Sequence, residues 1–304
     1  MGAIEEVLQA VSSERIGGHI RNLEGVRHPI AAQEALEAAA DYVWSQLQSW
    51  GYKMSVHRFR DGEREYRNII GTRQGTRQPE KRVIVIAHFD TVSTSPGAND
   101  NASGVAAMLE LARTFRRLKF GKSVQYVGVN LEEGKGEGEE GSQILRGSTA
   151  LAEHARASGW EIEGVVNFEE IAYAGEMIKQ TTPAGLPLEL PEVGNFIAVV
   201  GNEQSAGMVK GYIAGIERHR IPLPYQPLIV PGNGEMLPDT RRSDHAPFWD
   251  RGYRAIMLTD TANFRTPHYH QPSDTLETLN IPFATEVCRA AGCLVLDMAG
   301  YEHS

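Results

Sequence analysis

The first fifty residues place apolar side chains at helical spacing. Ser13 stands where it would cap a helix that runs from Glu14 to Leu23. A longer helix is predicted to end at Gly51, with an apolar face formed by Ala35, Leu36, Ala39, Val43, Leu47 and Trp50. We therefore expect a helical N-terminal segment that packs on the rest of the molecule.

After residue 51 the period changes from helical spacing to alternation, which is typical of strands. Residues 52–59 and 64–71 alternate on either side of an Asp-Gly pair at 61–62, so a β-hairpin is predicted. A polar loop is expected at 72–81. The run that follows at 82–88, RVIVIAH, is continuously apolar up to its last residue, as in a strand buried on both faces.

From there on, predicted helices and strands alternate. Further strands are expected at 124–130, 165–168, 196–200 and 255–258, and helices at 102–118, 148–157, 205–217 and 281–298. This order predicts an α/β fold with three αβα layers around a mixed, mostly parallel sheet, with antiparallel strands at one edge. Because no repeat or linker divides the chain, residues 1–304 are predicted to form a single domain, with 1–50 packed on it as helices.

Composition narrows the class of protein. The 304 residues are 41% hydrophobic and 23% charged, which is ordinary for a soluble globular protein, and the net charge of −9 argues against a nucleic-acid partner. No run approaches the ~20 apolar residues of a membrane span, and the N-terminus lacks the apolar core of a signal peptide. Two cysteines, Cys288 and Cys293, make no disulfide framework. We therefore expect a cytoplasmic protein without a membrane partner; the oligomeric state is left open.

Candidate metal ligands stand where the predicted strands end. In open α/β sheets, ligands bind beyond the carboxyl ends of the strands. The chain supplies His or acidic residues after four strands, and Asp100 just before a helix; the set is His88, Asp100, Glu133, Glu169 and His270. Imidazole and carboxylate ligands without thiolate suit zinc, manganese or cobalt at a catalytic site.

Five segments of the chain resemble the co-catalytic dizinc aminopeptidases, a superfamily that includes glutaminyl cyclases and glutamate carboxypeptidase II. They are AHFDTV, PGANDNASGVAAMLELA, QYVGVNLEE, RSDHAPFWDRGYRAIMLTDTA and YHQPSDT, and the resemblance runs from about Arg82 to the C-terminus. It implies a zinc-exopeptidase fold of the phosphorylase/hydrolase-like type, two divalent metal ions, best matched by Zn²⁺, and a peptide substrate.

The resemblance also implies a role for each residue of the set. His88 and Glu169 resemble the ligands of one metal, and Glu133 and His270 those of the second. Asp100 resembles the carboxylate that bridges both, at a metal–metal spacing of roughly 3.5–4 Å.

Three more residues resemble catalytic groups of the family. Glu132 resembles the general base, which must be a carboxylate free to take a proton from water. Asp90 resembles the group that orients the His88 ring. Tyr269 resembles a phenol that hydrogen-bonds the tetrahedral intermediate.

Alternatives remain for several ligands. A second Glu-Glu pair, at 139–140, is followed by Gly-Ser; we favour Glu132 and Glu133 because they directly end a strand. Glu170 is the rival of Glu169, and His268 the rival of His270. The glycine- and glutamate-rich stretch at 134–146 is predicted to be a flexible loop near the mouth of the cleft.

The function predicted from these residues is a metallo-aminopeptidase that removes N-terminal residues from peptides. The alternatives on the same fold are a glutaminyl-peptide cyclase and a carboxypeptidase or deacylase. A receptor-like relative without catalysis is the alternative from another class, but such proteins lose metal ligands and this chain keeps all five.

Overall fold

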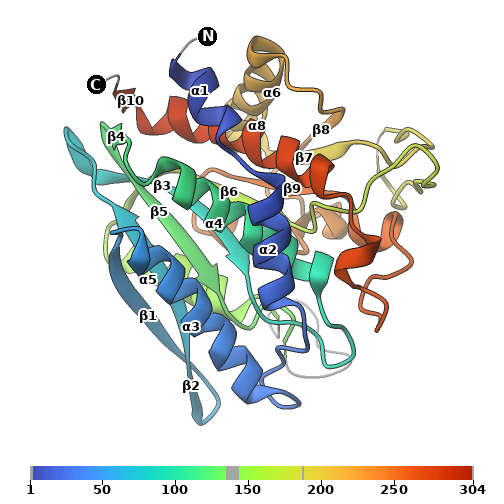
Figure 1. Cartoon of the computed structure of the whole chain (residues 1–304), viewed down its shortest axis with the longest axis horizontal. Helices are drawn as coiled ribbons and strands as arrows, with labels where there is room; N and C mark the ends of the chain where they lie inside the picture. The colour runs from blue at the N-terminus through green and yellow to red at the C-terminus, as the bar shows by residue number, and fades with distance from the viewer. Residues whose placement is uncertain (1–2, 135–143, 187, 303–304) are drawn as a thin grey trace.

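An eight-stranded mixed sheet forms the centre of the computed structural model, which describes residues 3–134, 144–186 and 188–302 (Figure 1). Its strand order is β1-β2-β5-β3-β6-β9-β7-β8. The strands are β1 (Lys53–Asp61), β2 (Arg64–Arg73), β3 (Gln78–His88), β5 (Lys122–Val129), β6 (Glu161–Glu169), β7 (Ile197–Asn202), β8 (Tyr225–Val230) and β9 (Ala255–Thr259). The four central strands β5, β3, β6 and β9 run parallel to one another.

Helices cover both faces of the sheet because its central strands are apolar on both sides. In β3, Val83 and Val85 join the core on one face, and Ile84 and Ile86 join the core on the other. The first face packs against α3 (Gln33–Ser49), α4 (Gly104–Phe115), α6 (Ala206–His219) and α8 (Ile281–Ala299). The second packs against α5 (Arg146–Ala157) and α7 (Ala246–Asp250).

The N-terminal helices form an outer layer on α4 and α8. They are α1 (Ala3–Gln9) and α2 (Ser13–Leu23), which lie beside α8 in Figure 1. The carboxylate of Glu110, fully buried in α4, accepts hydrogen bonds from the Arg15 guanidinium at 2.6 and 2.9 Å and from the Ser12 backbone N–H at 2.8 Å. A buried carboxylate needs such partners, so this contact helps fix α2 on the core.

The predicted three-layer α/β fold is confirmed, as are the hairpin and the order of the main helices and strands. Some boundaries were wrong. The strand β3 begins at Gln78, inside the stretch expected to be a loop, and the helix cap is Ser12, whose side chain accepts the Arg15 backbone N–H at 3.3 Å. The antiparallel pairs are not confined to one edge, because β7 runs antiparallel to β9.

Three strands were missed. The edge strand β8 contains Pro227 and is partly exposed, so its sequence lacks the pattern of a buried strand. The other two, β4 (Lys119–Phe120) and β10 (Tyr301–Glu302), are two residues each and pair with one another.

Across the described ranges, no helix combines the length and the hydropathy that crossing a bilayer requires. Both cysteines are buried free thiols.

Candidate metal centre

Three neighbouring strands deliver the first ligands to one edge of the sheet. His88 is the last residue of β3 and Glu169 the last residue of β6, while Glu132 and Glu133 follow the end of β5. Because β5, β3 and β6 are adjacent and parallel, their carboxyl ends meet. Asp100 comes from the kinked segment Ala98–Ser103 that precedes α4, at a position where the backbone is not helical.

These side chains form two groups that meet at Asp100. One group is His88, Glu132 and Glu169, and the other is Asp100, Glu133 and His270; within each, the potential ligand atoms lie within 4.8 Å of one another. One oxygen of Asp100 lies 3.4 Å from His88 Nε2 and the other lies 3.2 Å from His270 Nε2. A carboxylate that faces one histidine with each oxygen has the arrangement of a bridging ligand.

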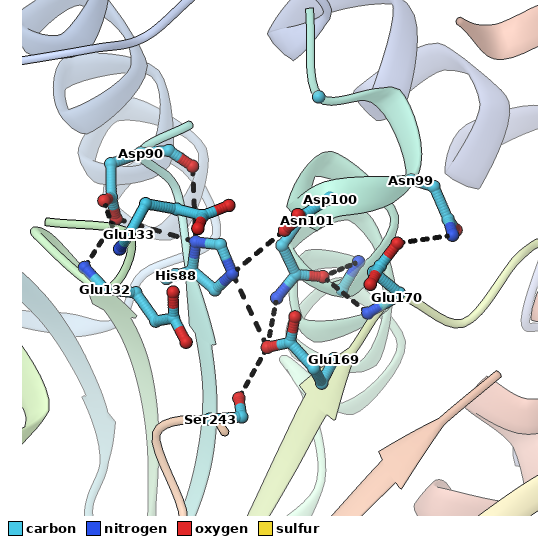
Figure 2. A network of polar contacts seen from close by, with 12 residues as sticks. His88, Asp90, Asn99, Asp100, Asn101, Glu132, Glu133, Glu169, Glu170 and Ser243 are labelled. Atoms are coloured by element: carbon cyan, nitrogen blue, oxygen red, sulfur yellow. Dashed lines mark hydrogen bonds and ion pairs between the residues drawn. The ribbon is translucent and has the colours of Figure 1, made fainter. Parts of the chain in front are cut away.

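Each histidine also faces a second carboxylate. His88 Nε2 lies 3.5 Å from Glu169 Oε2, and His270 Nε2 lies 3.1 Å from Glu133. Figure 2 shows the side chains of His88, Asp100 and Glu169 converging from separate segments of the chain. The five predicted metal ligands are therefore brought together at one site.

The atoms at the centre suit a metal. His88 Nε2 and the Asp100 Oδ1 atom are buried and make no hydrogen bond in the described part of the chain. His88 Nδ1 lies 3.2 Å from the backbone oxygen of Asp90; if Nδ1 carries the ring proton, Nε2 presents its lone pair to the centre. Nitrogen and oxygen donors without sulfur match a catalytic zinc site.

The charged groups of the site also favour a bound metal cation. Burial raises the pKa of Asp100, but the close approach of His270 and His88 outweighs it and holds that pKa below its usual range. Burial lowers the pKa of His270, yet Glu133 and Asp100 raise it to about 10. Burial likewise lowers the pKa of His88, and Glu169 and Glu132 raise it well above its ordinary value. The carboxylates therefore hold protons on these rings where a metal cation would supply the positive charge.

Glu132 and Glu133 both have raised pKa values. Glu132 is buried, and burial, followed by repulsion from Glu133 and Glu169, raises its pKa well above the ordinary value, although His88 opposes the shift. Burial and repulsion from Asp100 raise the pKa of Glu133 to about 8, although His270 and His88 oppose that shift. Such carboxyl groups hold their protons more tightly than free ones, which suits an acid–base role, and the position of Glu133 3.1 Å from His270 Nε2 favours it as the ligand of the two.

Asp90 contacts more than the ring it was predicted to orient. Its two carboxylate oxygens accept the backbone N–H groups of Glu132 and Glu133, at 3.1 and 3.0 Å. The His88 Nδ1 atom lies 3.6 Å from the carboxylate, farther than from the Asp90 backbone oxygen. Asp90 therefore fixes the turn that carries the Glu-Glu pair and lies beside the histidine.

Several residues that support the ligands were not predicted. Ser243 donates to Glu169 Oε2 at 2.5 Å. Asp274 accepts the backbone N–H groups of Asn99 and Asp100, at 2.8 and 3.1 Å, and so holds the loop that presents the bridging carboxylate. The sequence offered a signal for both, because they lie in the RSDHAP and QPSDT segments.

Arg27 is the largest omission. This buried guanidinium donates to the backbone oxygens of Phe89, Pro96 and Gly97 at 2.7, 2.9 and 3.0 Å, and so fixes the loop between β3 and Asp100. Burial lowers the pKa of Arg27 to about 10, and the nearby carboxylates oppose that shift, so the group stays charged at neutral pH. No local motif marks an isolated arginine between two helices.

The rival residues lie outside the two groups. Glu170 accepts a hydrogen bond from Asn99 Nδ2 at 3.2 Å, and His268 pairs with Ser273 at 2.9 Å. The rival pair at 139–140 lies outside the described residues, as does most of the predicted flexible loop.

Tyr269 stacks on the ring of His270, with 3.8 Å between ring centroids, and its hydroxyl accepts a hydrogen bond from Arg242 at 2.9 Å. The phenol therefore lies beside the second group, with its oxygen held by a cation.

A cavity of about 140 Å³ adjoins the site. The acidic end of its wall consists of Asp100, Glu132, Glu133, Glu169 and Glu170. The rest is largely apolar and includes Leu186, Leu190, Leu228, Met257 and Phe264. An apolar cavity that ends in convergent polar groups is typical of a small-ligand or peptide-end site.

The αβα fold and the paired histidine–carboxylate groups define a metal-dependent hydrolase. Its family follows from the sequence: residues 68–292 match the model of peptidase family M28, and the chain belongs to that family. It is similar to the uncharacterized protein YfbL of Escherichia coli K12, with 29% identity over 92% of this chain and 86% of that protein. A probable zinc metalloprotease of Pyricularia oryzae is 25% identical over 88% of this chain and 58% of that protein.

Solved structures agree on the fold. A glutaminyl cyclase from Macrostomum lignano superposes with a TM-score of 0.79, covering 99% of this chain and 94% of that one at 16% identity. An aminopeptidase from Aneurinibacillus sp. strain AM-1 superposes with a TM-score of 0.71, covering 98% and 96%, also at 16% identity. At this identity the likeness concerns the fold alone.

Proposed function

We propose that this protein is a metallo-aminopeptidase that hydrolyses the N-terminal residue from peptides, with two zinc ions held by His88, Asp100, Glu133, Glu169 and His270. The observation that carries the proposal is the position of Asp100 between two histidines, each with a carboxylate of its own. The M28 family match and the relative named as a probable zinc metalloprotease support peptide hydrolysis and zinc.

Bound divalent ions would supply Lewis-acid chemistry, which lowers the pKa of water and polarises a carbonyl oxygen. The chain's own residues do the rest. Glu132 takes the proton of the attacking water and passes it to the leaving amine. The Asp90 carboxylate holds Glu132 in place by accepting a hydrogen bond from the Glu132 backbone N–H. The Tyr269 hydroxyl, fixed by Arg242, donates to the oxygen on which negative charge develops.

We also propose that the chain works as one catalytic domain, because the N-terminal helices share the core of the sheet. A cytoplasmic location remains a proposal, supported by two free, buried thiols.

The test is to strip the protein with a chelator, restore zinc, manganese or cobalt, and measure bound metal by elemental analysis. The same samples are assayed with aminoacyl p-nitroanilides, with their N-acetylated analogues and with a glutaminyl peptide. We expect two metals per chain and hydrolysis of the free-amine substrates alone. Cleavage of the acetylated analogues, or cyclisation of the glutaminyl peptide without hydrolysis, would contradict the proposal.

A further inference from the structure

Glu170 is a buried carboxylate at the substrate cavity that the proposed metal site does not use. It follows Glu169 directly, and its positive φ of 45° turns the chain away from the direction of β6. Its backbone N–H donates to Asn101 Oδ1 at 3.1 Å. The side chain is 1% exposed and forms part of the cavity wall.

Only half of this carboxylate has a partner within the described residues. Oε1 accepts from Asn99 Nδ2 at 3.2 Å, whereas Oε2 makes no hydrogen bond. The same Asn99 amide also donates to Asp260 Oδ2 at 2.9 Å, so one NH₂ group serves two buried carboxylates (the Asn99–Glu170 bond is drawn in Figure 2). A buried carboxylate oxygen without a donor is costly unless the group takes up a proton or a cation meets it.

The charged groups that act most strongly on Glu170 do not supply that cation. They are Asp100, Asp260, Glu169 and Asp274, all acidic. Glu170 also belongs to neither group of candidate metal ligands. A cation that meets Oε2 would therefore come from a molecule that enters the cavity, whose wall includes Glu170.

The position of Glu170 indicates which positively charged group of a peptide would bind there. The α-amino nitrogen of a peptide's first residue is only about 2.5 Å from its carbonyl carbon, from standard bond lengths and angles. A carboxylate that binds it must therefore adjoin the reacting centre, as Glu170 does through its neighbours Glu169 and Asp100. The ammonium group of a lysine side chain lies several bonds farther out.

The more distant wall of the cavity is unsuited to a cation. It is formed by apolar side chains of the sheet, among them Val200, Leu228 and Met257. An acidic residue there, Asp239, already has the Arg242 guanidinium at 3.4 Å. This end fits an apolar side chain.

We infer that Glu170 binds the α-ammonium group of the substrate's N-terminal residue, while the apolar wall receives that residue's side chain. The inference rests on the proposed aminopeptidase function and deepens it. It explains how a free amino terminus is selected, because a blocked amine carries no positive charge for Glu170 to bind.

The test compares Glu170→Gln, which keeps the shape and removes the charge, with the control Glu176→Gln on an exposed residue. Two substrates are used: leucyl-p-nitroanilide, and 4-methylpentanoyl-p-nitroanilide, which lacks the amine. For the first, Glu170→Gln should lower kcat/KM by about 10- to 100-fold, the usual range for a hydrogen bond to a charged group. The wild type should cleave the second far more slowly, because it lacks the ammonium group, and Glu170→Gln should change that slow rate less than about threefold. Bound metal should stay at the wild-type level.

A second readout does not depend on catalysis. Calorimetric titration of the metal-loaded protein with 3-methylbutylamine, a leucine side chain with an ammonium group, should show binding that Glu170→Gln weakens and Glu176→Gln preserves. If the wild type carries metal but cleaves neither substrate, the proposed function fails and this titration still decides the role of Glu170. Equal losses on both substrates, or unchanged amine binding, would overturn the inference.

Discussion

The carboxylate of Asp90 lies 3.1 Å from the backbone N–H of Glu132, a contact between the loop after β3 and the turn after β5. Through it, the residue beside the first histidine sets the position of the proposed base. The geometry of the site therefore depends on hydrogen bonds to the backbone as well as on the ligands themselves.

Replacing Asp90 by Asn should weaken the turn that carries the proposed base. An amide keeps one acceptor oxygen and turns an NH₂ group toward the backbone N–H of Glu132 or Glu133, so one buried donor loses its partner. We expect the free energy of unfolding to fall by about 1–3 kcal/mol, and kcat to fall with it. Urea unfolding and steady-state kinetics measure both; Asp41→Asn, at an exposed position, is the control and should change neither.

Glu132 and Glu133 should respond differently to removal of charge. Glu132→Gln is expected to keep both metals and to lower kcat by about 10²–10⁴, the usual contribution of a general base. Glu133→Gln should lower metal occupancy, because it changes a proposed ligand. Metal analysis and kinetics on the same preparations decide the matter, and a Glu132→Gln protein with normal turnover would reverse the assignment.

If Asp100 bridges the two metals, substitutions at the site should differ in the number of metals that they remove. Asp100→Asn should reduce occupancy at both positions, whereas His270→Gln should remove about one metal per chain. His268→Gln is the matched control, since His268 pairs with Ser273 outside both groups, and it should retain two metals. Two metals retained by Asp100→Asn would exclude the bridge.

Metal affinity should fall as the solution becomes more acidic. Glu133 and Asp100 raise the pKa of His270 to about 10, so the metal-free ring is protonated at neutral pH. A metal must displace that proton, and each proton released lowers the affinity about tenfold for each pH unit of acidification below the pKa. Competition with a zinc chelator at pH 6, 7 and 8 measures the slope, which should be shallower in His270→Gln; an affinity independent of pH contradicts the prediction.

Loss of the Arg27 guanidinium should disturb the site from a distance. Arg27→Met leaves the backbone oxygens of Phe89, Pro96 and Gly97 without this donor. The Pro96 and Gly97 oxygens keep the backbone N–H groups of Gly25 and Ala102, so the expected cost is about 1–3 kcal/mol, for the Phe89 oxygen. We expect lower stability together with weaker metal binding. Arg21→Met, on the exposed surface of α2, is the control; unchanged metal affinity in a folded Arg27→Met protein would show that the loop does not need this support.

The sequence predicted the ligands better than their supports. His88 and Glu169 directly end apolar strands, so their meeting follows from the parallel order of β3 and β6. Arg27 and Ser243 act on groups that are distant in the chain, and only the folded structure brings them there. The short or partly exposed strands β4, β8 and β10 were missed for a related reason: pairing with a neighbour stabilises them, and their own sequences carry little pattern.

Asp90 is a further example of contacts between distant segments that the sequence does not reveal. Its place two residues after His88 suggested a contact with that ring. In the fold its carboxylate lies 3.6 Å from His88 Nδ1 and also accepts backbone N–H groups of a segment about forty residues farther along. Proximity in sequence pointed to the first of these contacts and gave no sign of the second.

The contacts of Arg27 limit how far the N-terminus of this enzyme can be shortened. The segment that matches the family model starts at residue 68, so a fragment cut to those limits would omit both Arg27 and the helix that carries Arg15. Glu110 would then be buried without its counter-charge, and the ligand-bearing loop would lose its anchor. The smallest portion able to act independently therefore includes the helices that precede the recognised homology, and shorter expression products should misfold or fail to retain zinc.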